Sequence, residues 1–545
     1  MAYSRKIVAL LLALVASAAF AADPPSGQDA GMRIYRAGVL PSGAALRGEL
    51  RNGAQLKGAD AACVQCHRRS GLGGGEGQKS IRPITGKQLF AQATASTTTE
   101  RAGWLSAGAQ ARPPYTVATL AQALREGVDP AGRTLDELMP RFDMSDADVE
   151  QLATYLQTLS QTWSPGVSEN EIHFATVVTP GVEPLRTKAM LDVLQAFFAD
   201  KNAGTRKEGK RKALGREPMH RAYRTWVLHV WKLEGLPETW AAQLAAYYQA
   251  QPVFAALSGI GAGNWRPVHE FCEQVGLPCL FPNVDYPVIS ETDYASIYFS
   301  RGIVLEAEVL AKYLAEVSQH GQVVQVFRDN AAGRVPAQAL RSALQGHGIT
   351  DIADHPVSGQ SPVPLAFWSS LLGGKRVGTL VLWLNEGDLV NLHALGEPPP
   401  RLDSIYLSAS LVASPCRALL CDSWLDKVRL IYPFELAARR AQRASRMDFW
   451  FRAKNIPLLD ERVQANTYFA VTAAGDALAH MGENFSRDFF IERVEQMTEQ
   501  SLSSSVYPRL SLGPGQRFAS RGGYVVRFSG VDENKLVPVS EWIVP

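Results

Sequence analysis

The sequence CVQCHRRSGLGGGEG, residues 63–77, holds two cysteines separated by two residues, with a histidine directly after the second. In this spacing the two thiols can form thioethers with the vinyl groups of a haem while the histidine coordinates its iron. The motif occurs once, in a chain with 6 Cys and 10 His. The alternative is a chance disulfide beside an unrelated histidine. We therefore expect one covalently attached haem c, anchored by Cys63 and Cys66 and coordinated by His67.

A second axial ligand should lie downstream, and LDELMPRFDMSDADVEQLATYLQTL, residues 135–159, contains two methionines. Met139 precedes Pro140, which keeps the chain extended and can present a thioether to iron. Met144 is the competing candidate, and methionine often serves only as a core side chain. We prefer Met139 as the second ligand.

A helix is expected to follow these methionines, over residues 145–160. Ser145 is a suitable N-cap, and acidic residues populate the first turn. Apolar residues then recur at helical spacing, at Val149, Leu152, Tyr155, Leu156 and Leu159.

With these features, residues 28–161 resemble the class I cytochromes c. The resemblance implies an all-α domain whose first and last helices cross beside the haem, with Gly31 and Tyr35 meeting the helix that carries Tyr155. The segment departs from the compact family pattern by a long loop, residues 71–116, whose glycines and prolines predict irregular structure.

The resemblance also implies the haem ligands. Cys63 and Cys66 would be the thioether anchors, and His67 and Met139 the two axial ligands. Methionine ligation raises the reduction potential, and six-coordinate iron has no vacant position for oxygen or peroxide. We therefore expect outer-sphere electron transfer and no catalysis at the iron.

The first 22 residues read as an export signal. Arg5 and Lys6 precede an apolar run that ends in small residues, Ala19-Phe20-Ala21. An uncleaved anchor is the alternative, but the run is shorter than the roughly 20 residues that span a bilayer. We expect a soluble periplasmic protein without a transmembrane segment after cleavage.

Length and composition bound the remaining possibilities. A chain of 545 residues should form three or four folding units. Its net charge of +2, from 55 Lys plus Arg against 53 Asp plus Glu, gives no global field for nucleic acid or anionic lipid. A hydrophobic content of 46% is ordinary for a globular protein.

Four further cysteines form two close pairs, Cys272 with Cys279 and Cys416 with Cys421. In an oxidising compartment such pairs favour two disulfides that close short loops. A metal site and four reduced, buried thiols are the alternatives.

Beyond a linker at residues 165–170, short apolar runs alternate with helical patterns. The segment IHFATVV is followed by LRTKAMLDVLQAFFAD, and TWVLHVWKL by PETWAAQLAAYYQ. The alternation resumes with GQVVQVFRD and predicts parallel sheets covered by helices. We assign residues 1–22 to the signal, 23–164 to the cytochrome domain and 171–545 to an α/β region with two lobes and two parallel sheets.

Residues 170–530 resemble the type I periplasmic solute-binding proteins, the group of branched-chain amino acid receptors. The resemblance rests on AALSGIGAGNWRPVHEFCEQVGLPCLFPNVD, on IYFSRG at the switch into the second lobe, and on a closing hairpin at SLGPGQRFASRGGYVVRF. It implies that a small ligand binds between the lobes.

The glycines at 259, 261 and 263 lie between a strand and a helix. Their GxGxG spacing differs from the GxGxxG of dinucleotide sites, and no acidic residue stands at the ribose position. Backbone NH groups at a helix N-terminus could instead hold an anion. A tight turn without a ligand is the alternative.

The resemblance places the ligand on the loops 258–264 and 282–286 of the first lobe. The sequence departs from the serine and threonine usual there, which weakens the expectation of an amino acid ligand. Second-lobe candidates come from the ends of its strands, and Tyr286 and Trp383 could stack on a flat ligand. The pocket candidates are Gly261, Ala262, Asn264, Asn283, Asp285, Tyr286, Trp383, Asn385, Ser408 and Ser410.

Residues 201–224 carry nine basic and two acidic side chains. This stretch could dock an acidic redox partner through weak, salt-sensitive attraction. A solvated loop is the alternative.

Two classes of function remain. In the first, the protein is a periplasmic electron carrier whose binding-protein module recruits a small ligand or a redox partner, such as a dehydrogenase or another cytochrome. In the second, it is a solute receptor for transport or sensing with an accessory haem. An enzyme is not indicated, since no nucleophile-base pair or paired carboxylates have diagnostic spacing.

Overall fold

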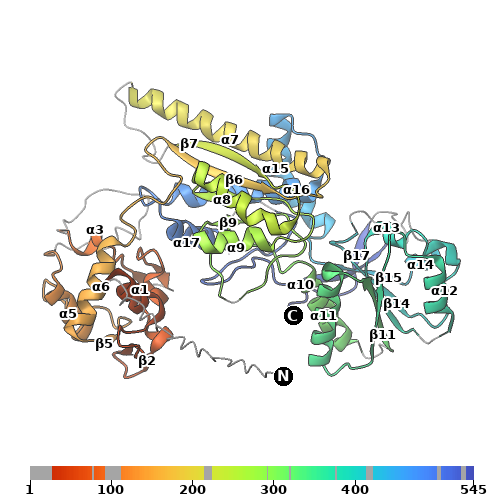
Figure 1. Cartoon of the computed structure of the whole chain (residues 1–545), viewed down its shortest axis with the longest axis horizontal. Helices are drawn as coiled ribbons and strands as arrows, with labels where there is room; N and C mark the ends of the chain where they lie inside the picture. The colour runs from red at the N-terminus through yellow and green to blue at the C-terminus, as the bar shows by residue number, and fades with distance from the viewer. Residues whose placement is uncertain are drawn as a thin grey trace, which may run out of the picture. The chain divides into compact units, whose positions relative to one another are not determined.

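The structure is a computed structural model, and the chain in it divides into two compact units, Met1–Gln161 and Thr162–Pro545 (Figure 1). The predicted export signal, Cys416 with Cys421, and residues 214–223 of the basic stretch lie outside the described residues. Within the described part, no helix combines the length and the apolar character needed to cross a membrane. The described residues are 27–76, 79–91, 112–213, 224–290, 292–317, 321–374, 377–412, 422–499, 505–529 and 535–545.

The first unit is mainly helical. Its helices are α1 (Gly27–Ala37), η1 (Gly58–Ala61), α2 (Val64–His67), α3 (Gly86–Leu89), α5 (Val117–Arg125) and α6 (Asp146–Thr158). The predicted terminal helix is confirmed as α6: Ser145 is its N-cap and forms a capping box with Asp148.

The expectation of an all-α first domain was incomplete, because this unit also contains short strands. An antiparallel sheet has the order β2-β1-β5, and β3 pairs with β4 inside the long loop that was expected to be irregular. Each strand has three residues, too few for an alternating pattern to be visible in the sequence. Their bounds are β1 (Arg47–Glu49), β2 (Gln55–Lys57), β3 (Gly74–Glu76), β4 (Lys79–Ile81) and β5 (Arg141–Asp143).

The first and last helices cross at Gly31, as the resemblance implied. A Cβ atom on Gly31 would lie 2.2 Å from the carbonyl oxygen of Gln151 and 2.6 Å from Cβ of Tyr155, so only glycine allows the two backbones to approach this closely. One turn further along α1, the ring of Tyr35 packs on Tyr155 with 5.4 Å between ring centroids.

The first lobe of the second unit is built on a parallel sheet of the order β10-β9-β8-β6-β7. Successive residues of β6 face opposite sides: Phe174 packs against Phe198 of α7, whereas Val177 clusters with Trp240 of α8 and Phe271 of α9. The elements are β6 (Glu171–Val178), α7 (Pro184–Ala213), β7 (Thr225–Lys232), η2 (Pro237–Thr239), α8 (Trp240–Ala250), β8 (Ala255–Leu257), α9 (Arg266–Val275), β9 (Cys279–Leu280) and β10 (Ser296–Ile297).

The second lobe has a seven-stranded sheet of the order β12-β11-β13-β14-β15-β16-β17. The first five strands are parallel, but β16 and β17 run antiparallel, so the expectation of a second parallel sheet was wrong at this edge. These two strands pair antiparallel without a crossover helix, and the closing hairpin expected at residues 511–528 contributes only β16, because its partner β17 lies beyond that stretch. The strands are β11 (Val323–Arg328), β12 (Ile352–Val357), β13 (Thr379–Trp383), β14 (Ser404–Ser408), β15 (Val428–Tyr432), β16 (Tyr524–Phe528) and β17 (Leu536–Pro538).

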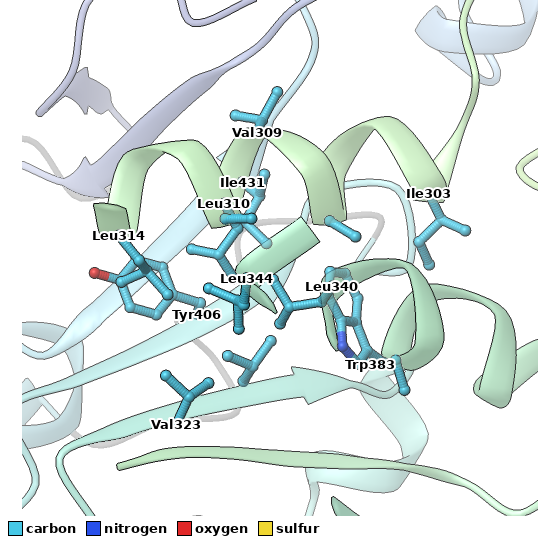
Figure 2. Packing of buried hydrophobic residues seen from close by; sticks show 14 of the residues in the cluster. Ile303, Val309, Leu310, Leu314, Val323, Leu340, Leu344, Trp383, Tyr406 and Ile431 are labelled. Atoms are coloured by element: carbon cyan, nitrogen blue, oxygen red, sulfur yellow. The ribbon is translucent and has the colours of Figure 1, made fainter. Parts of the chain in front are cut away.

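Helices α10 and α11 pack on this sheet over an apolar core. Figure 2 shows Leu310 and Leu314 of α10 with Leu340 and Leu344 of α11 above the strands. The second-lobe helices are α10 (Ile303–Glu316), α11 (Ala331–Gly346), α12 (Leu365–Gly374), α13 (Glu386–Leu389), η3 (His393–Leu395) and α14 (Asp422–Leu425).

After β15 the chain returns to the first lobe through α15 (Ala437–Lys454), α16 (Glu461–Ala479) and α17 (Arg487–Thr498). Phe469 of α16 packs edge-on against Phe281, the residue that follows β9. Arg487 of α17 donates to the carbonyl oxygens of Val253 and Phe254, the two residues that precede β8. The first lobe is therefore completed by residues that follow β11 to β15 of the second-lobe sheet and precede its last two strands, β16 and β17.

We predict that Gly31→Ala destabilises the first unit by about 1–3 kcal/mol, because the added Cβ forces α1 and α6 apart. Calorimetry should show the first unit's transition at lower temperature and the second unit's unchanged. Gly75→Ala is the matched control, since a Cβ there meets nothing within 4 Å. Equal melting of both variants would contradict the crossing as a packing constraint.

Candidate functional site

His67 is held in one orientation by a backbone hydrogen bond. Its Nδ1 lies 3.0 Å from the carbonyl oxygen of Arg82. A carbonyl can only accept, so Nδ1 carries the proton and Nε2 is left as the coordinating nitrogen. Desolvation lowers the pKa of His67 to about 4, which keeps the ring neutral. A neutral, oriented imidazole is what iron coordination needs.

The two thiols of the motif are also placed for thioether formation. Cys63 is the residue before α2, Cys66 lies within that helix, and neither forms a disulfide. Cys63 packs at the edge of the apolar core, and its burial raises the pKa of the thiol to about 12. The residues present therefore fit a haem c: one helical turn offers two unoxidised thiols and a neutral histidine.

The two methionine candidates lie in different surroundings. Met144 is buried within the core, and its carbonyl oxygen accepts from Nε of Arg125. Met139 is half-buried at the margin of that core, in a turn closed by its amide donating to the carbonyl of Asp136. The placement favours Met139 as the side chain that can reach a ligand, and its assignment to iron stays a prediction.

The glycine loop of the first lobe is satisfied by the protein itself. The amides of Gly259, Ile260, Gly261 and Ala262 donate in turn to Thr176 Oγ1, to the carbonyls of Val177 and Asn283, and to Thr179 Oγ1. Four consecutive NH groups are thus engaged, which favours the tight turn over the anion site. Further along, Asn264 accepts from the amide of Arg266 at the start of α9.

Asn283 is part of a buried polar network instead of facing an open pocket. Its Nδ2 donates to Ser258 Oγ at 3.1 Å, and its Oδ1 accepts from Nδ2 of Asn466 at 3.2 Å. Ser258 in turn lies 2.9 Å from the hydroxyl of Thr467. These contacts join the loops after β8 and β9 to helix α16.

Two second-lobe candidates have structural partners. Trp383 is only 2% exposed and lies in the core shown in Figure 2, with its indole nitrogen donating to Gln325 Oε1 at 3.0 Å. Asn385 caps α13 by accepting from the amide of Asp388. In this conformation neither side chain is positioned to stack on or bind a ligand.

Three other candidates converge on one residue that sequence reasoning missed. Asp285 and Tyr286 follow β9 in the first lobe, and Ser410 follows β14 in the second. All three surround Glu306 of α10: the amide of Ser410 donates to its Oε1 at 3.2 Å, and Asp285 and Tyr286 interact with it electrostatically. We call these four residues and Arg462 the Glu306 cluster.

Glu306 is a fully buried acid whose second oxygen is unsatisfied. It is 0% exposed, and Oε2 has no hydrogen-bond partner of good geometry among the described residues. Burial raises the pKa of Glu306 to about 7; hydrogen bonding to Ser408 and Ser410 and the charge of Arg462 oppose the rise, and Asp285 adds to it. Near neutral pH the carboxyl group is therefore poised between its two protonation states.

Arg462 balances the other carboxylate of the cluster. Its guanidinium, on the first turn of α16, forms an ion pair with Asp285 and lies over the ring of Phe434, 4.9 Å from the centroid. It also approaches the hydroxyl of Tyr507 at 3.4 Å. Burial by itself would lower the pKa of Arg462, but the charge of Asp285 and the hydroxyl of Tyr507 raise it above its ordinary value, so the guanidinium remains charged.

A sequence signal for Glu306 exists in retrospect. In the segment IVLEAEVLAKYL, Glu306 stands three residues after Ile303 and four before Leu310, on the stripe that α10 buries. An acid in the apolar stripe of an amphipathic helix indicates a special environment. No such signal points to Arg462, which lies 156 residues further along the chain.

The cysteines and the basic stretch are accounted for in part. Cys272 of α9 and Cys279 of β9 form a disulfide, as expected. At the ends of the basic stretch, Arg224 is buried and lies over the ring of Trp163, and Lys201 lies over the ring of Phe197. These two cations contact aromatic rings within the second unit and do not form an open basic surface.

We predict that Glu306→Gln removes a pH-dependent loss of stability. The folded-state pKa is raised from 4.5 to about 7, so the native state holds the proton more tightly and wild-type stability falls between these pH values, by about 3 kcal/mol in all. In thermal unfolding of the second unit, the stability of the variant relative to the wild type should therefore increase as pH rises from 5 to 8. If the unfolding temperatures of the variant and the wild type changed in parallel with pH, the raised pKa of Glu306 would be contradicted.

Comparison with known proteins agrees with the two-unit architecture. Residues 50–160 match the cytochrome c family. No curated protein sequence matches the chain. One similar solved structure is a branched-chain amino acid ABC transporter protein from Thermus thermophilus with bound valine, with 13% identity and a TM-score of 0.50, covering 70% of this chain and 98% of that one. A second is an ABC transporter substrate-binding protein from Aeropyrum pernix, with 12% identity and a TM-score of 0.52, covering 69% of this chain and 96% of that one. A third is a substrate-binding periplasmic protein from Ralstonia solanacearum, with 12% identity and a TM-score of 0.50, covering 67% of this chain and 99% of that one.

At these identities the structural likeness concerns the fold. The chain thus joins a cytochrome c domain at residues 50–160 to a larger unit with the fold of the periplasmic binding proteins of branched-chain amino acid ABC transporters.

Proposed function

We propose that the protein is a periplasmic electron carrier that transfers single electrons through one covalent haem c, and that its second unit recognises a small ligand or a redox partner. Cys63 and Cys66 would anchor the haem, and His67 and Met139 would be the axial ligands. The haem would supply a one-electron couple, and the protein would act without catalysis at the iron.

The orientation of His67 is the observation that carries this proposal. The hydrogen bond from Nδ1 to the carbonyl of Arg82 fixes the tautomer and directs Nε2 away from the backbone. An orienting partner of this kind is typical of metal-binding histidines. A histidine that merely followed a chance Cys-x-x-Cys would have no need of it, and the match to the cytochrome c family supports the same assignment.

A periplasmic location is supported by two independent features. The first residues carry the pattern of an export signal. Cys272 and Cys279 form a disulfide, which persists in an oxidising compartment. Thioether attachment of haem belongs to the same exported class of proteins.

The second candidate function is a solute receptor with an accessory haem. It is favoured by the fold of the second unit, since one solved structure of that fold is described with bound valine. Against a close functional likeness, the glycine loop and Asn283 already have protein partners. The two functions differ in whether ligand binding alters electron transfer.

We predict that Met139→His lowers the reduction potential of the haem, because a nitrogen ligand replaces the thioether. A redox titration monitored by haem absorbance would measure the change. Met144→Leu is the control: it should keep the potential and cost less than about 1.5 kcal/mol of stability, as a volume-conserving core substitution. A shift caused by Met144→Leu and absent from Met139→His would reverse the assignment.

We further predict that a ligand exists that stabilises the second unit of the full-length protein. A panel of amino acids, carboxylates, amines, alcohols and metal ions should contain at least one compound that raises its unfolding temperature, since a hundredfold excess over the dissociation constant contributes about 2.7 kcal/mol.

The same ligand then separates the two functions. In the electron carrier, it should change the haem potential or the rate of electron exchange with a partner protein. In the receptor with an accessory haem, both should be unaffected. If no compound binds, we expect the second unit to recognise a protein partner instead. That partner would be sought by its electron exchange with the reduced protein.

A further inference from the structure

Glu306 has hydrogen-bonding capacity that the protein does not use. Oε1 accepts from the amide of Ser410, and the hydroxyls of Ser408 and Ser410 also interact with the carboxyl group, but Oε2 is buried and makes no hydrogen bond of good geometry to any described residue. A buried polar atom left unpaired costs about 1–3 kcal/mol, and more when the group is charged. An unsatisfied buried group of this kind needs an explanation, such as a functional role or a bound water or ion.

The cluster reaches from the interior to the surface. Glu306 is fully buried, whereas Asp285, Tyr286 and Ser410 are each partly exposed. These residues come from both lobes, since Asp285 and Tyr286 follow β9 and Ser410 follows β14. A small group bound there would contact both lobes at once.

We infer that Glu306 is the receptor for a cationic amine group of the ligand, with Oε2 as the acceptor. This inference rests on the proposed function, in which the second unit binds a small ligand, and it adds the chemical class of that ligand.

The charges of the cluster select a cation. Asp285 and Arg462 neutralise each other as an ion pair, so ionised Glu306 leaves one uncompensated negative charge. An ammonium group would make the cluster neutral and supply the missing donor to Oε2. A carboxylate ligand would instead add a second uncompensated negative charge in a buried place, which is strongly unfavourable.

The aromatic neighbour is compatible with the same class. Tyr286 is half-buried, and burial together with Asp285 and Glu306 raises the pKa of its hydroxyl, so it stays neutral. A neutral phenol can donate or accept and does not compete for the cation as a second charge. Among the described residues, the charged and titratable groups that interact with Glu306 are thus Asp285 from the loop after β9, Tyr286 beside it and Arg462 from α16.

Binding of an amine should be linked to proton release. Around neutral pH Glu306 is partly protonated, and only the ionised carboxylate pairs with an ammonium ion. Affinity should therefore rise with pH and level off above neutrality, by about tenfold between pH 6 and pH 8. An alkylamine remains protonated throughout this range, so the change reports on the protein.

The test uses isothermal titration calorimetry on the full-length protein and compares three probes that share the same branched four-carbon skeleton. Isobutylamine carries the cation alone, 3-methylbutanoate the anion alone, and valine both. We expect isobutylamine to bind with the stated pH dependence and 3-methylbutanoate not to bind. Glu306→Gln should weaken isobutylamine binding on the order of tenfold or more, because the charge is lost while the shape remains.

Glu308→Gln is the matched control on the same helix. Glu308 pairs with Arg301 at 2.7 Å and does not belong to the cluster, so the variant should bind isobutylamine as the wild type does. Unchanged thermal unfolding of the second unit at low pH would show that Glu306→Gln is folded.

Three outcomes would overturn the inference. Binding of 3-methylbutanoate without isobutylamine would assign the site to anion recognition, and equal binding by Glu306→Gln would place the amine elsewhere. In both cases the proposed ligand-binding role stands. If none of the three probes binds, the inference fails, and the wider panel described above decides whether the ligand-binding role fails with it.

Discussion

The buried polar network between helix α16 and the loops after β8 and β9 fixes the centre of the second unit. Asn283 and Thr467 are both almost fully buried, and each side chain finds its partners across a long separation in sequence. Because unpaired polar groups are costly in the interior, this network has essentially one satisfactory arrangement. Helix α16 is thereby held on the first lobe, and its first turn places Arg462 against Asp285.

This arrangement uses residues that would otherwise be available to a ligand. The glycine loop and Asn283 are occupied by intramolecular hydrogen bonds, and Trp383 serves the core of the second lobe. At the Glu306 cluster, by contrast, one carboxylate oxygen of Glu306 has no hydrogen-bond partner among the described residues. The fold is that of a solute-binding protein, but the polar groups left for recognition differ from those expected at its loops.

In the first unit, the reactive groups lie close together in sequence, whereas the residues that support them come from distant parts of the chain. Two thiols and an imidazole lie within about one helical turn because of their spacing in sequence. The orientation of His67 depends on the carbonyl of Arg82, 15 residues away. The core beside the motif depends on the crossing of α1 and α6 at Gly31. The two units thus have separate apolar cores.

The sequence by itself determined the elements whose chemistry is local. The haem motif, the capped helix α6, the alternation of strands and helices and the disulfide between Cys272 and Cys279 could all be predicted, since each depends on spacing within a few residues. The three-residue strands of the first unit could not, because they carry no readable period.

Only the tertiary structure decided which side chains share a site. Arg462 lies far along the chain from Asp285 and Glu306, and it joins them because α16 returns to the first lobe after strand β15 of the second. Likewise, burial separated Met144 from Met139, although both lie in the same stretch of sequence. Burial and pairing between distant segments are properties of packing, which local sequence patterns do not encode.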